Sequence, residues 1–317
     1  MAIPTKVEQK ATEPATARLQ SKIVLLLGIA AFCLLNANLS YSQIPQSERE
    51  ALIALYSATS GDSWTNKTGW NGAVGSECDW YGVTCTSGQI TTLSLGSNNL
   101  SGTIPTELGN LTSLIQLNFF NNSLTGTIPA ELGNLTNLTY LGLAGNQLSG
   151  SIPSTLGNLT SLNYLRLYIN ALTGSIPAEL GDLTNLIELS LGHNQLSGSI
   201  PSALGSLSNL TALNLYDNQL SGSIPSALGS LSNLTILNLS TNSLTGPLPQ
   251  WLSDMAISTL NVIDAFILAP VVAISGGNRT IEDSDGIAGE SVSFTGTATD
   301  SDGTIATTQW LVDGVDD

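Results

Sequence analysis

Hydrophobic and polar positions repeat along the middle of the chain with a period of 24 residues. Seven copies of one pattern, L-x-x-L-x-L-x-x-N-x-L with small departures, run from ITTLSLGSNNL at residues 90–100 to LTILNLSTNSL at residues 234–244. An asparagine holds the same place in every copy: Asn98, Asn122, Asn146, Asn170, Asn194, Asn218 and Asn242. A fixed period of this length predicts a solenoid, in which each repeat forms one coil that stacks on the next.

Each copy of the pattern predicts one short strand. Leu117 and Phe119 are separated by one residue, as are Leu141 and Leu143, so each pair points to the same face of a strand and enters a shared core. The asparagine follows where the strand turns inward. Its carboxamide carries both donors and acceptors, so a stack of these side chains can pair the backbone groups that the turn removes from the strand ladder.

A second constant unit lies between the copies, as in SGSIPSTLGNL at residues 149–159. Its Gly and Pro residues predict a turn and a short helical or 3-10 segment on the convex side of the coil. With the phrase L-S-G-x-I-P, the array resembles the plant-type leucine-rich repeats of receptor kinases and polygalacturonase-inhibitor proteins. The resemblance implies an α/β fold over residues 93–268, a right-handed leucine-rich-repeat solenoid with a parallel concave β-sheet. It says less about the ligand, because this fold is a scaffold for many ligands.

A helix and a tryptophan-rich segment precede the repeats. Apolar residues at helical spacing predict one amphipathic helix over residues 44–57, with Ser47 and Glu50 forming a capping box at its start. Three tryptophans follow, and the last lies within CDWYGVTC: Trp64, Trp70 and Trp80. These features together resemble the N-terminal cap of plant-type repeat proteins, here residues 43–92. A cap shields the apolar end of the first coil, so we interpret the tryptophans as cap core rather than as a sugar-binding platform.

The first 42 residues are typical of an export signal. Four basic residues precede the apolar run IVLLLGIAAFCLL at residues 23–35, which gives way to small and polar residues. Because this run is short for a membrane span, we predict a secretory signal peptide over residues 1–42, with a retained N-terminal membrane anchor as the alternative. Cys78 and Cys85 then remain in the mature chain, and an even number of cysteines in an exported protein predicts one disulfide.

The composition changes after Pro270 to Val, Thr, Gly and Asp. Three short strands are expected there, at residues 271–274, 291–294 and 308–312. The order GESVSFTGTATDSDGTI, followed by a tryptophan, resembles a PKD or related immunoglobulin-like module of bacterial surface proteins, so residues 269–317 are predicted to form a partial β-sandwich. Its two DSDG sequences favour turns over a calcium site. We expect Trp251 and the segment 258–268 to cover the last coil.

Outward-facing strand residues of successive coils should form columns, because neighbouring strands lie ~4.8 Å apart. Large side chains concentrate on these columns in the middle of the array, and Tyr and Arg are enriched in interface hot spots. We therefore predict a ligand-binding site on the concave face, made of Phe120, Tyr140, Tyr164, Arg166, Tyr168, Glu188, His193, Tyr216 and Asp217. The competing interpretation is drift at unconstrained positions of a duplicated repeat.

Charge and composition argue against several classes of function. The net charge is −16, which argues against a nucleic-acid partner because phosphate contacts need clustered Lys and Arg. His193 is the only histidine, and neither a zinc site nor a catalytic serine relay has a recognisable sequence context around it. We expect no metal, no cofactor and no enzymatic activity.

These observations predict a secreted or cell-surface recognition scaffold that binds a protein, peptide or glycan on its concave face. Contact with a membrane is expected only if the N-terminal segment is retained as an anchor. Two alternatives stay open. One is an inhibitor of secreted polysaccharide-degrading hydrolases, which the resemblance to polygalacturonase-inhibitor proteins implies. The other is a structural adhesin or an ice-binding surface.

Overall fold

The computed structural model describes residues 44–255, 257–261, 294–299 and 305–310 of the 317-residue chain. The predicted signal peptide and the first expected strand of the C-terminal module, residues 271–274, lie outside the described residues. Within the described part, no helix combines the length and the hydropathy that a membrane span needs.

Helix α2, Gln46–Ala58, is the first element of the described part, and its apolar side is buried in the core. The predicted capping box is wrong. Pro45 is the N-cap residue and no side chain caps the helix, while Gln46 Nε2 donates to Glu50 Oε1 at 2.7 Å. The rigid φ of Pro45 lets the helix begin directly after it, so Ser47 lies inside the first turn and cannot act as a cap.

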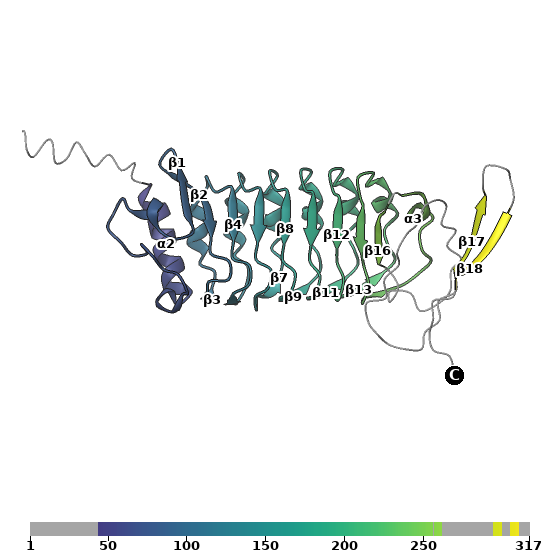
Figure 1. Ribbon diagram of the computed structural model, residues 1–317, viewed down its shortest axis with the longest axis horizontal. Helices are drawn as coiled ribbons and strands as arrows, with labels where there is room; N and C mark the ends of the chain where they lie inside the picture. Colours follow the sequence, from purple (N-terminus) through teal and green to yellow (C-terminus); the bar gives the residue numbers. More distant parts are fainter. Residues whose placement is uncertain (1–43, 256, 262–293, 300–304, 311–317) are drawn as a thin grey trace, which may run out of the picture. The chain divides into compact units, whose positions relative to one another are not determined.

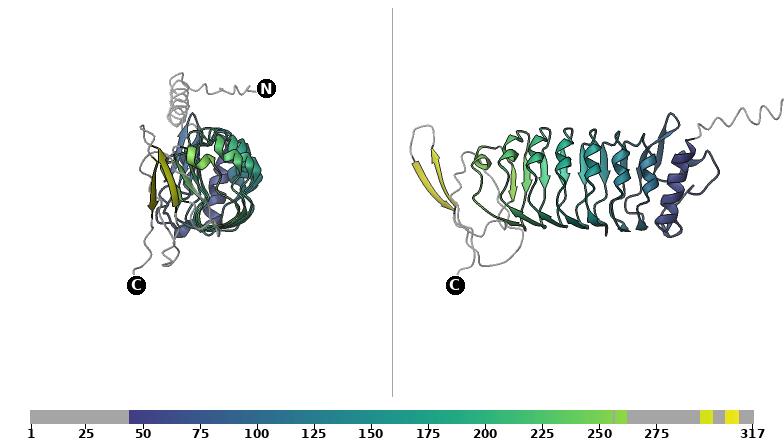
Figure 2. Two further views of the ribbon diagram at one scale, coloured as in Figure 1. Left: turned by 90° about the vertical axis from the view of Figure 1, so that its right-hand side faces the viewer. Right: turned by 180° about the vertical axis from the view of Figure 1, so that it is seen from behind.

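Nine strands form the main sheet, in the order β1-β2-β4-β6-β8-β10-β12-β14-β16 (Figures 1 and 2). Their bounds are β1 Val83–Thr86, β2 Gln89–Ser94, β4 Gln116–Asn118, β6 Tyr140–Gly142, β8 Tyr164–Arg166, β10 Glu188–Ser190, β12 Ala212–Asn214, β14 Ile236–Asn238 and β16 Thr259–Asn261. β1 pairs antiparallel with β2, and the following strands are parallel. Tyr140 pairs with Tyr164, and Tyr164 with Glu188, so equivalent positions are adjacent. The predicted columns are therefore confirmed.

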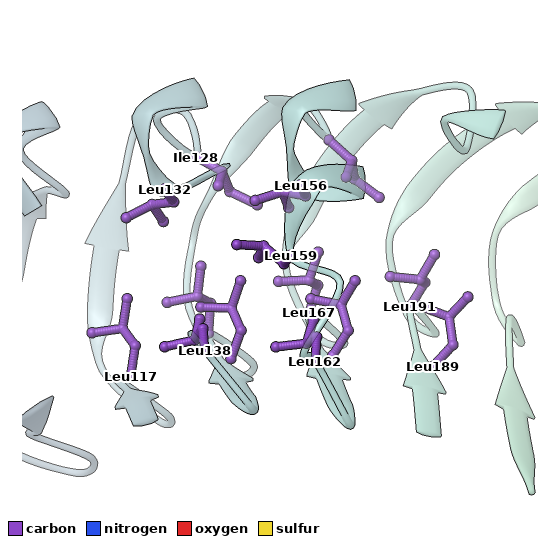
Figure 3. Close-up of a cluster of buried hydrophobic side chains, with 14 of the residues drawn as sticks. Leu117, Ile128, Leu132, Leu138, Leu156, Leu159, Leu162, Leu167, Leu189 and Leu191 are labelled. Carbon is purple, nitrogen blue, oxygen red and sulfur yellow. The ribbon is translucent and has the colours of Figure 1, made fainter. Parts of the chain in front are cut away.

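A 3-10 segment follows the proline of each constant unit: η3 Thr106–Asn110, η4 Ala130–Asn134, η5 Ser154–Asn158, η6 Ala178–Asp182, η7 Ser202–Ser206 and η8 Ser226–Ser230. Leucines of these segments and of the strands fill the space between them, and Leu156, Leu159 and Leu162 are fully buried (Figure 3). Successive segments pack so closely that a Cβ on Gly157 would lie 2.5 Å from the Glu179 carbonyl oxygen. This contact explains the glycine of the L-G-x-L phrase.

The structure contains a second sheet that the sequence pattern did not reveal. Five short strands make it: β7 Ser149–Ser151, β9 Ala171–Gly174, β11 Gln195–Gly198, β13 Gln219–Gly222 and β15 Ser243–Leu244. β3 Ser101–Thr103 and β5 Ser123–Thr125 form a parallel pair of the same kind. Figure 1 shows the labelled strands of this set along one edge of the coils. The glycines of these segments indicated turns. Because the coils stack in register, each segment instead lies beside the equivalent segment of the next coil and pairs with it, as in the 2.8 Å bond from Ser149 N–H to Gly126 O.

The repeated asparagines form the hydrogen-bond ladder that the pattern predicts. Asn146 Nδ2 donates to Leu143 O and to Phe119 O of the preceding coil, both at 3.0 Å. Asn146 Oδ1 accepts the Leu124 N–H at 3.0 Å. The same three bonds recur in the other coils, at Asn122, Asn170, Asn194, Asn218 and Asn242. Each coil is therefore tied to its neighbour by side chains as well as by strands.

Tryptophans fill the cap. Trp64, Trp70 and Trp80 are 4%, 8% and 1% exposed. Their rings contact in order, with centroids 4.7 Å apart for Trp64 and Trp70 and 5.1 Å apart for Trp70 and Trp80. Since their faces are buried, the interpretation as cap core is confirmed over that of a sugar-binding platform.

Polar contacts join the cap to the first coil. Glu48 of α2 is buried and accepts the Ile90 N–H of β2 at 2.8 Å. Burial raises the pKa of Glu48, and the hydrogen bond from Ile90 opposes this effect. Asn98 begins the asparagine ladder by pairing with the cap: its Nδ2 donates to Asn66 O at 2.9 Å, and its Oδ1 accepts the Asn66 N–H at 2.7 Å.

Two short 3-10 segments, η1 Gly61–Ser63 and η2 Glu77–Asp79, complete the cap. Cys78 of η2 and Cys85 of β1 are bonded, with their Cα atoms 5.5 Å apart. The bond closes the loop that carries Trp80 into the cap core.

The last coil is covered by α3, Trp251–Asp254, and by the segment that leads into β16. Trp251 packs on Gly229 of η8, where an added Cβ would lie 2.8 Å from the indole ring, and Leu252 and Ile257 are buried. Trp251 and residues 258–261 therefore take the place expected of them, whereas residues 262–268 lie outside the described residues.

In the C-terminal segment, β17 Phe294–Thr299 pairs antiparallel with β18 Ile305–Trp310. These strands overlap the expected strands at 291–294 and 308–312 only in part. The partial β-sandwich over residues 269–317 stays a prediction.

Candidate functional site

The predicted site residues lie on the outward side of β4 to β12 and of the residues that directly follow these strands. We term this surface the sheet face, made of Phe120, Tyr140, Tyr164, Arg166, Tyr168, Glu188, His193, Tyr216 and Asp217. Alternate residues of a strand point to opposite sides, so Leu165 enters the core while Tyr164 and Arg166 face outward. All nine side chains are exposed or half-buried, and none belongs to the core.

Arg166 is the centre of a polar and aromatic cluster. Its Nε and Nη2 donate to Glu188 Oε1 and Oε2 at 3.0 and 2.6 Å. Its guanidinium carbon lies 5.6 Å from the centroid of the Tyr140 ring and 5.5 Å from that of Tyr164. The hydrogen bonds to Glu188 raise the pKa of Arg166 further, against the opposing effect of burial. Because planar, bidentate and stacked contacts fix Arg166, the cluster is preorganised.

Two further residues extend this cluster and were absent from the predicted site. Ser190 Oγ donates to Glu188 Oε1 at 3.0 Å, and Asn214 Nδ2 donates to Ser190 Oγ at 3.2 Å. Both residues stand in the column of Arg166, one and two coils further on. Their short polar side chains carried no signal by themselves, although their column positions could have identified them as neighbours of Glu188.

An aromatic ridge, made of Phe120, Tyr168 and Tyr216, runs beside the Arg166 cluster. The Phe120 and Tyr168 centroids are 6.4 Å apart, although a whole coil separates the two residues, because Ala144 between them is small and is covered by its surroundings. Tyr216 lies over Gly192, where a Cβ would come within 2.3 Å of its ring. Burial first, then Tyr168 and Asp217, raise the pKa of Tyr216.

His193 and Asp217 form a surface pair through Nδ1 and Oδ2. The structure thus brings them together, as their column predicts, but on an exposed part of the face. Among the described residues, no three His, Cys, Asp or Glu side chains lie close enough together to hold a metal ion.

Ile169 also borders the aromatic ridge, and sequence reasoning missed it. It has a positive φ of 55° and is 45% exposed. This left-handed conformation costs a residue with a branched Cβ about 1–2 kcal/mol. The signal was in the column: the equivalent residues are Ser97, Asn121, Gly145, His193, Asp217 and Thr241. Ile169 is the single aliphatic residue among these seven positions.

Two family profiles match the chain. The profile described as "Leucine-rich repeat region" covers residues 89–269, and the profile described as "Leucine rich repeat N-terminal domain" covers residues 45–86. The chain belongs to the leucine-rich repeat proteins. The resemblance of this leucine-rich repeat protein to plant-type repeats with an N-terminal cap is therefore confirmed.

Its relatives include receptors. A probable inactive receptor kinase of Arabidopsis thaliana is 36% identical over 99 residues, which are 31% of this chain and 14% of that protein. The crystal structure of PEPR1 with AtPEP1 matches with a TM-score of 0.62 and 34% identity, over 74% of this chain and 33% of that one. The Arabidopsis receptor kinase HAESA, in complex with the peptide hormone IDA and the co-receptor SERK1, matches with a TM-score of 0.58 and 30% identity, over 67% of this chain and 40% of that one. This leucine-rich repeat protein thus spans well under half the length of each of these relatives.

Proposed function

We propose that this protein is a non-enzymatic recognition module, secreted or held at the cell surface, that binds a peptide or protein on the sheet face. The observation that carries the proposal is the Arg166 cluster. In it, Arg166, Glu188, Tyr140 and Tyr164 face outward from adjacent coils and hold one another in place. Its support from outside the chain is the similarity to PEPR1 and HAESA, which were solved with AtPEP1 and with the peptide hormone IDA. The resemblance of the cap and of the export signal to those of exported proteins supports the location.

The mechanism of binding is presentation of a preformed surface. Arg166 is held by Glu188 and two tyrosine rings before any ligand arrives. These side chains have therefore already lost their conformational freedom before binding. Association then costs less entropy, because mainly the ligand has to become ordered. Clustered Tyr and Arg at the centre of a face are also the residue types that dominate interface energies.

The test uses a phage-displayed library of random linear peptides, selected on the immobilised chain. The double variant Tyr164→Ala/Tyr168→Ala removes two rings from the sheet face without opening the core, because both are half-buried at the surface. We expect capture of the selected peptides to fall about tenfold or more, while the free energy of unfolding changes little.

Tyr81→Ala is the matched control. Tyr81 is 41% exposed but lies in the cap, and its backbone N–H and C=O bond to Thr68 and Trp70 independently of its ring. Capture by this variant should equal that of the wild type. Equal capture by the double variant and the wild type would reject the sheet face as the binding surface.

A further inference from the structure

Ile169 stands at a position where the backbone φ is positive in all seven coils, from Ser97 to Thr241, and it is the single aliphatic residue among these positions. Its backbone N–H bonds to Gly192 O at 3.0 Å, as the backbone of an Asn or Gly at this place would. Its side chain is 45% exposed and so contributes little to the core. A strained residue with an exposed apolar side chain points to a contact made outside the chain.

The surroundings of Ile169 extend the apolar surface. Tyr168 precedes it and contacts Phe120, which is itself 40% exposed. Gly145 fills the equivalent place one coil earlier, and a Cβ there would lie 3.7 Å from the Phe120 ring. The ring of Phe120 thus lies beside Gly145, which precedes Ile169 in the column. Phe120, Tyr168 and Ile169 together form one exposed apolar patch across neighbouring coils.

The same column carries one carboxylate beyond Ile169. It continues with His193 and then Asp217, which lies two strands away from Ile169. Arg166 already shares its charge with Glu188, while Asp217, although paired with His193, keeps a side chain that is 43% exposed. The surroundings of the patch are therefore complementary to a basic ligand rather than to an acidic one.

We propose that Phe120, Tyr168, Ile169 and Asp217 bind a basic linear peptide that places an apolar side chain on the patch and a Lys or Arg at Asp217. Two strand spacings of ~4.8 Å separate the two ends, and an extended peptide advances ~3.3 Å per residue. The apolar and the basic residue are therefore about three positions apart in the ligand. This inference rests on the proposed function and names the chemistry of its ligand.

Ile169→Asn is the first test. Asn accepts a positive φ, as Asn121 does in the same column at 55°, so the variant should be at least as stable as the wild type. In the peptide selection, it should capture peptides with the apolar and basic spacing about tenfold less well. Equal capture of these peptides by Ile169→Asn and by the wild type would show that the isoleucine side chain does not contact the ligand, and that result would overturn the proposal.

Asp217→Asn is the second test, because it removes the charge and keeps a residue that accepts the backbone φ of 51° at this place. The preference for Lys or Arg should disappear, and binding should lose most of its dependence on salt. Enrichment of acidic peptides on the wild type would overturn the proposal. If peptides bind through Tyr164 but ignore Ile169 and Asp217, this inference fails alone. If the wild type selects no peptide at all, the proposed function fails with it.

Discussion

The two sheets of the array come from the same repeat but present different surfaces. The second sheet exposes mostly Ser, Thr and Gly, whereas the main sheet exposes Tyr, Phe, Arg and Glu in its middle coils. The reason lies in the backbone. Gly150, Gly174, Gly198 and Gly222 of the second sheet have positive φ values of 74°, 77°, 78° and 77°, which favours glycine at each of these places. The strands of the main sheet carry no such restriction, so their outward residues are free to differ from coil to coil.

The largest expected effect concerns the asparagine ladder, which bonds to the strands of the main sheet and to the edge strands that follow them. Asn146→Ala would leave the Leu124 N–H of β5 without a partner and remove a donor from Phe119 O and Leu143 O. We expect a loss of about 3 kcal/mol in the free energy of unfolding, because each buried polar group left unpaired costs about 1–3 kcal/mol. Denaturant titration measures it.

Gln147→Ala, at the exposed neighbouring position, is the control for Asn146→Ala and should change stability by less than about 0.5 kcal/mol. Equal effects of the two substitutions would show that the ladder does not hold the sheets together.

Replacing a glycine by alanine should have different effects at Gly181, which packs between coils, and at Gly192, which lies under Tyr216 on the sheet face. A Cβ on Gly181 would lie 2.5 Å from the Ala203 carbonyl oxygen, which is backbone, so Gly181→Ala should destabilise the array by about 2 kcal/mol. A Cβ on Gly192 would meet the Tyr216 ring, which can rotate away, so Gly192→Ala should cost under about 1 kcal/mol and still alter peptide capture. Unfolding and capture measured on both variants test this, and a reversed order of stabilities contradicts it.

The smallest expected effect concerns the cap, where α2 meets the first coils. Glu48 of α2 bonds to β2 of the main sheet, and the carbonyl oxygen of Thr59, directly after α2, accepts the Ser101 N–H of β3. Burial raises the pKa of Glu48 above its ordinary value of 4.5, so the folded state holds this proton more tightly than the unfolded state does. That stabilising contribution is complete below pH 4.5 and is lost as the pH rises through the folded-state pKa.

Glu48→Gln keeps an acceptor for the Ile90 N–H but cannot ionise. Its stability relative to the wild type should therefore increase as the pH rises from below 4.5 toward neutrality. Unfolding titrations across this range measure the difference. Glu50→Gln, which removes an exposed carboxylate from the same helix, is the matched control. A difference that does not vary with pH would contradict the role assigned to Glu48.

Strict spacing made the main sheet predictable. In every copy, two apolar residues such as Leu117 and Phe119 alternate with outward-facing residues. Because the copies are 24 residues apart, stacking them in register places Tyr164 beside Glu188. The second sheet was not predictable in this way, since its strands form through stacking and not through local preference. The capping box failed because a proline can start a helix without a side-chain cap.

Prediction of the candidate site was limited by side-chain conformation. The columns placed Arg166 beside Glu188, but whether its guanidinium would reach Tyr140 depended on rotamers that spacing does not specify. The columns also placed Ser190 and Asn214 near Glu188, but not the hydrogen bonds that join them to it. Ile169 was overlooked because the sequence does not state a backbone φ. The sequence showed only that one aliphatic residue stands in a column of otherwise polar or small residues.

The asparagine ladder also determines how such a protein can change length. Because every Asn bonds one coil back and completes the turn of that coil, a whole 24-residue unit can be duplicated or deleted between ladder positions while each junction keeps its partners. The face would then widen or narrow in steps of one strand, and the chemistry already present on the remaining coils would stay in place.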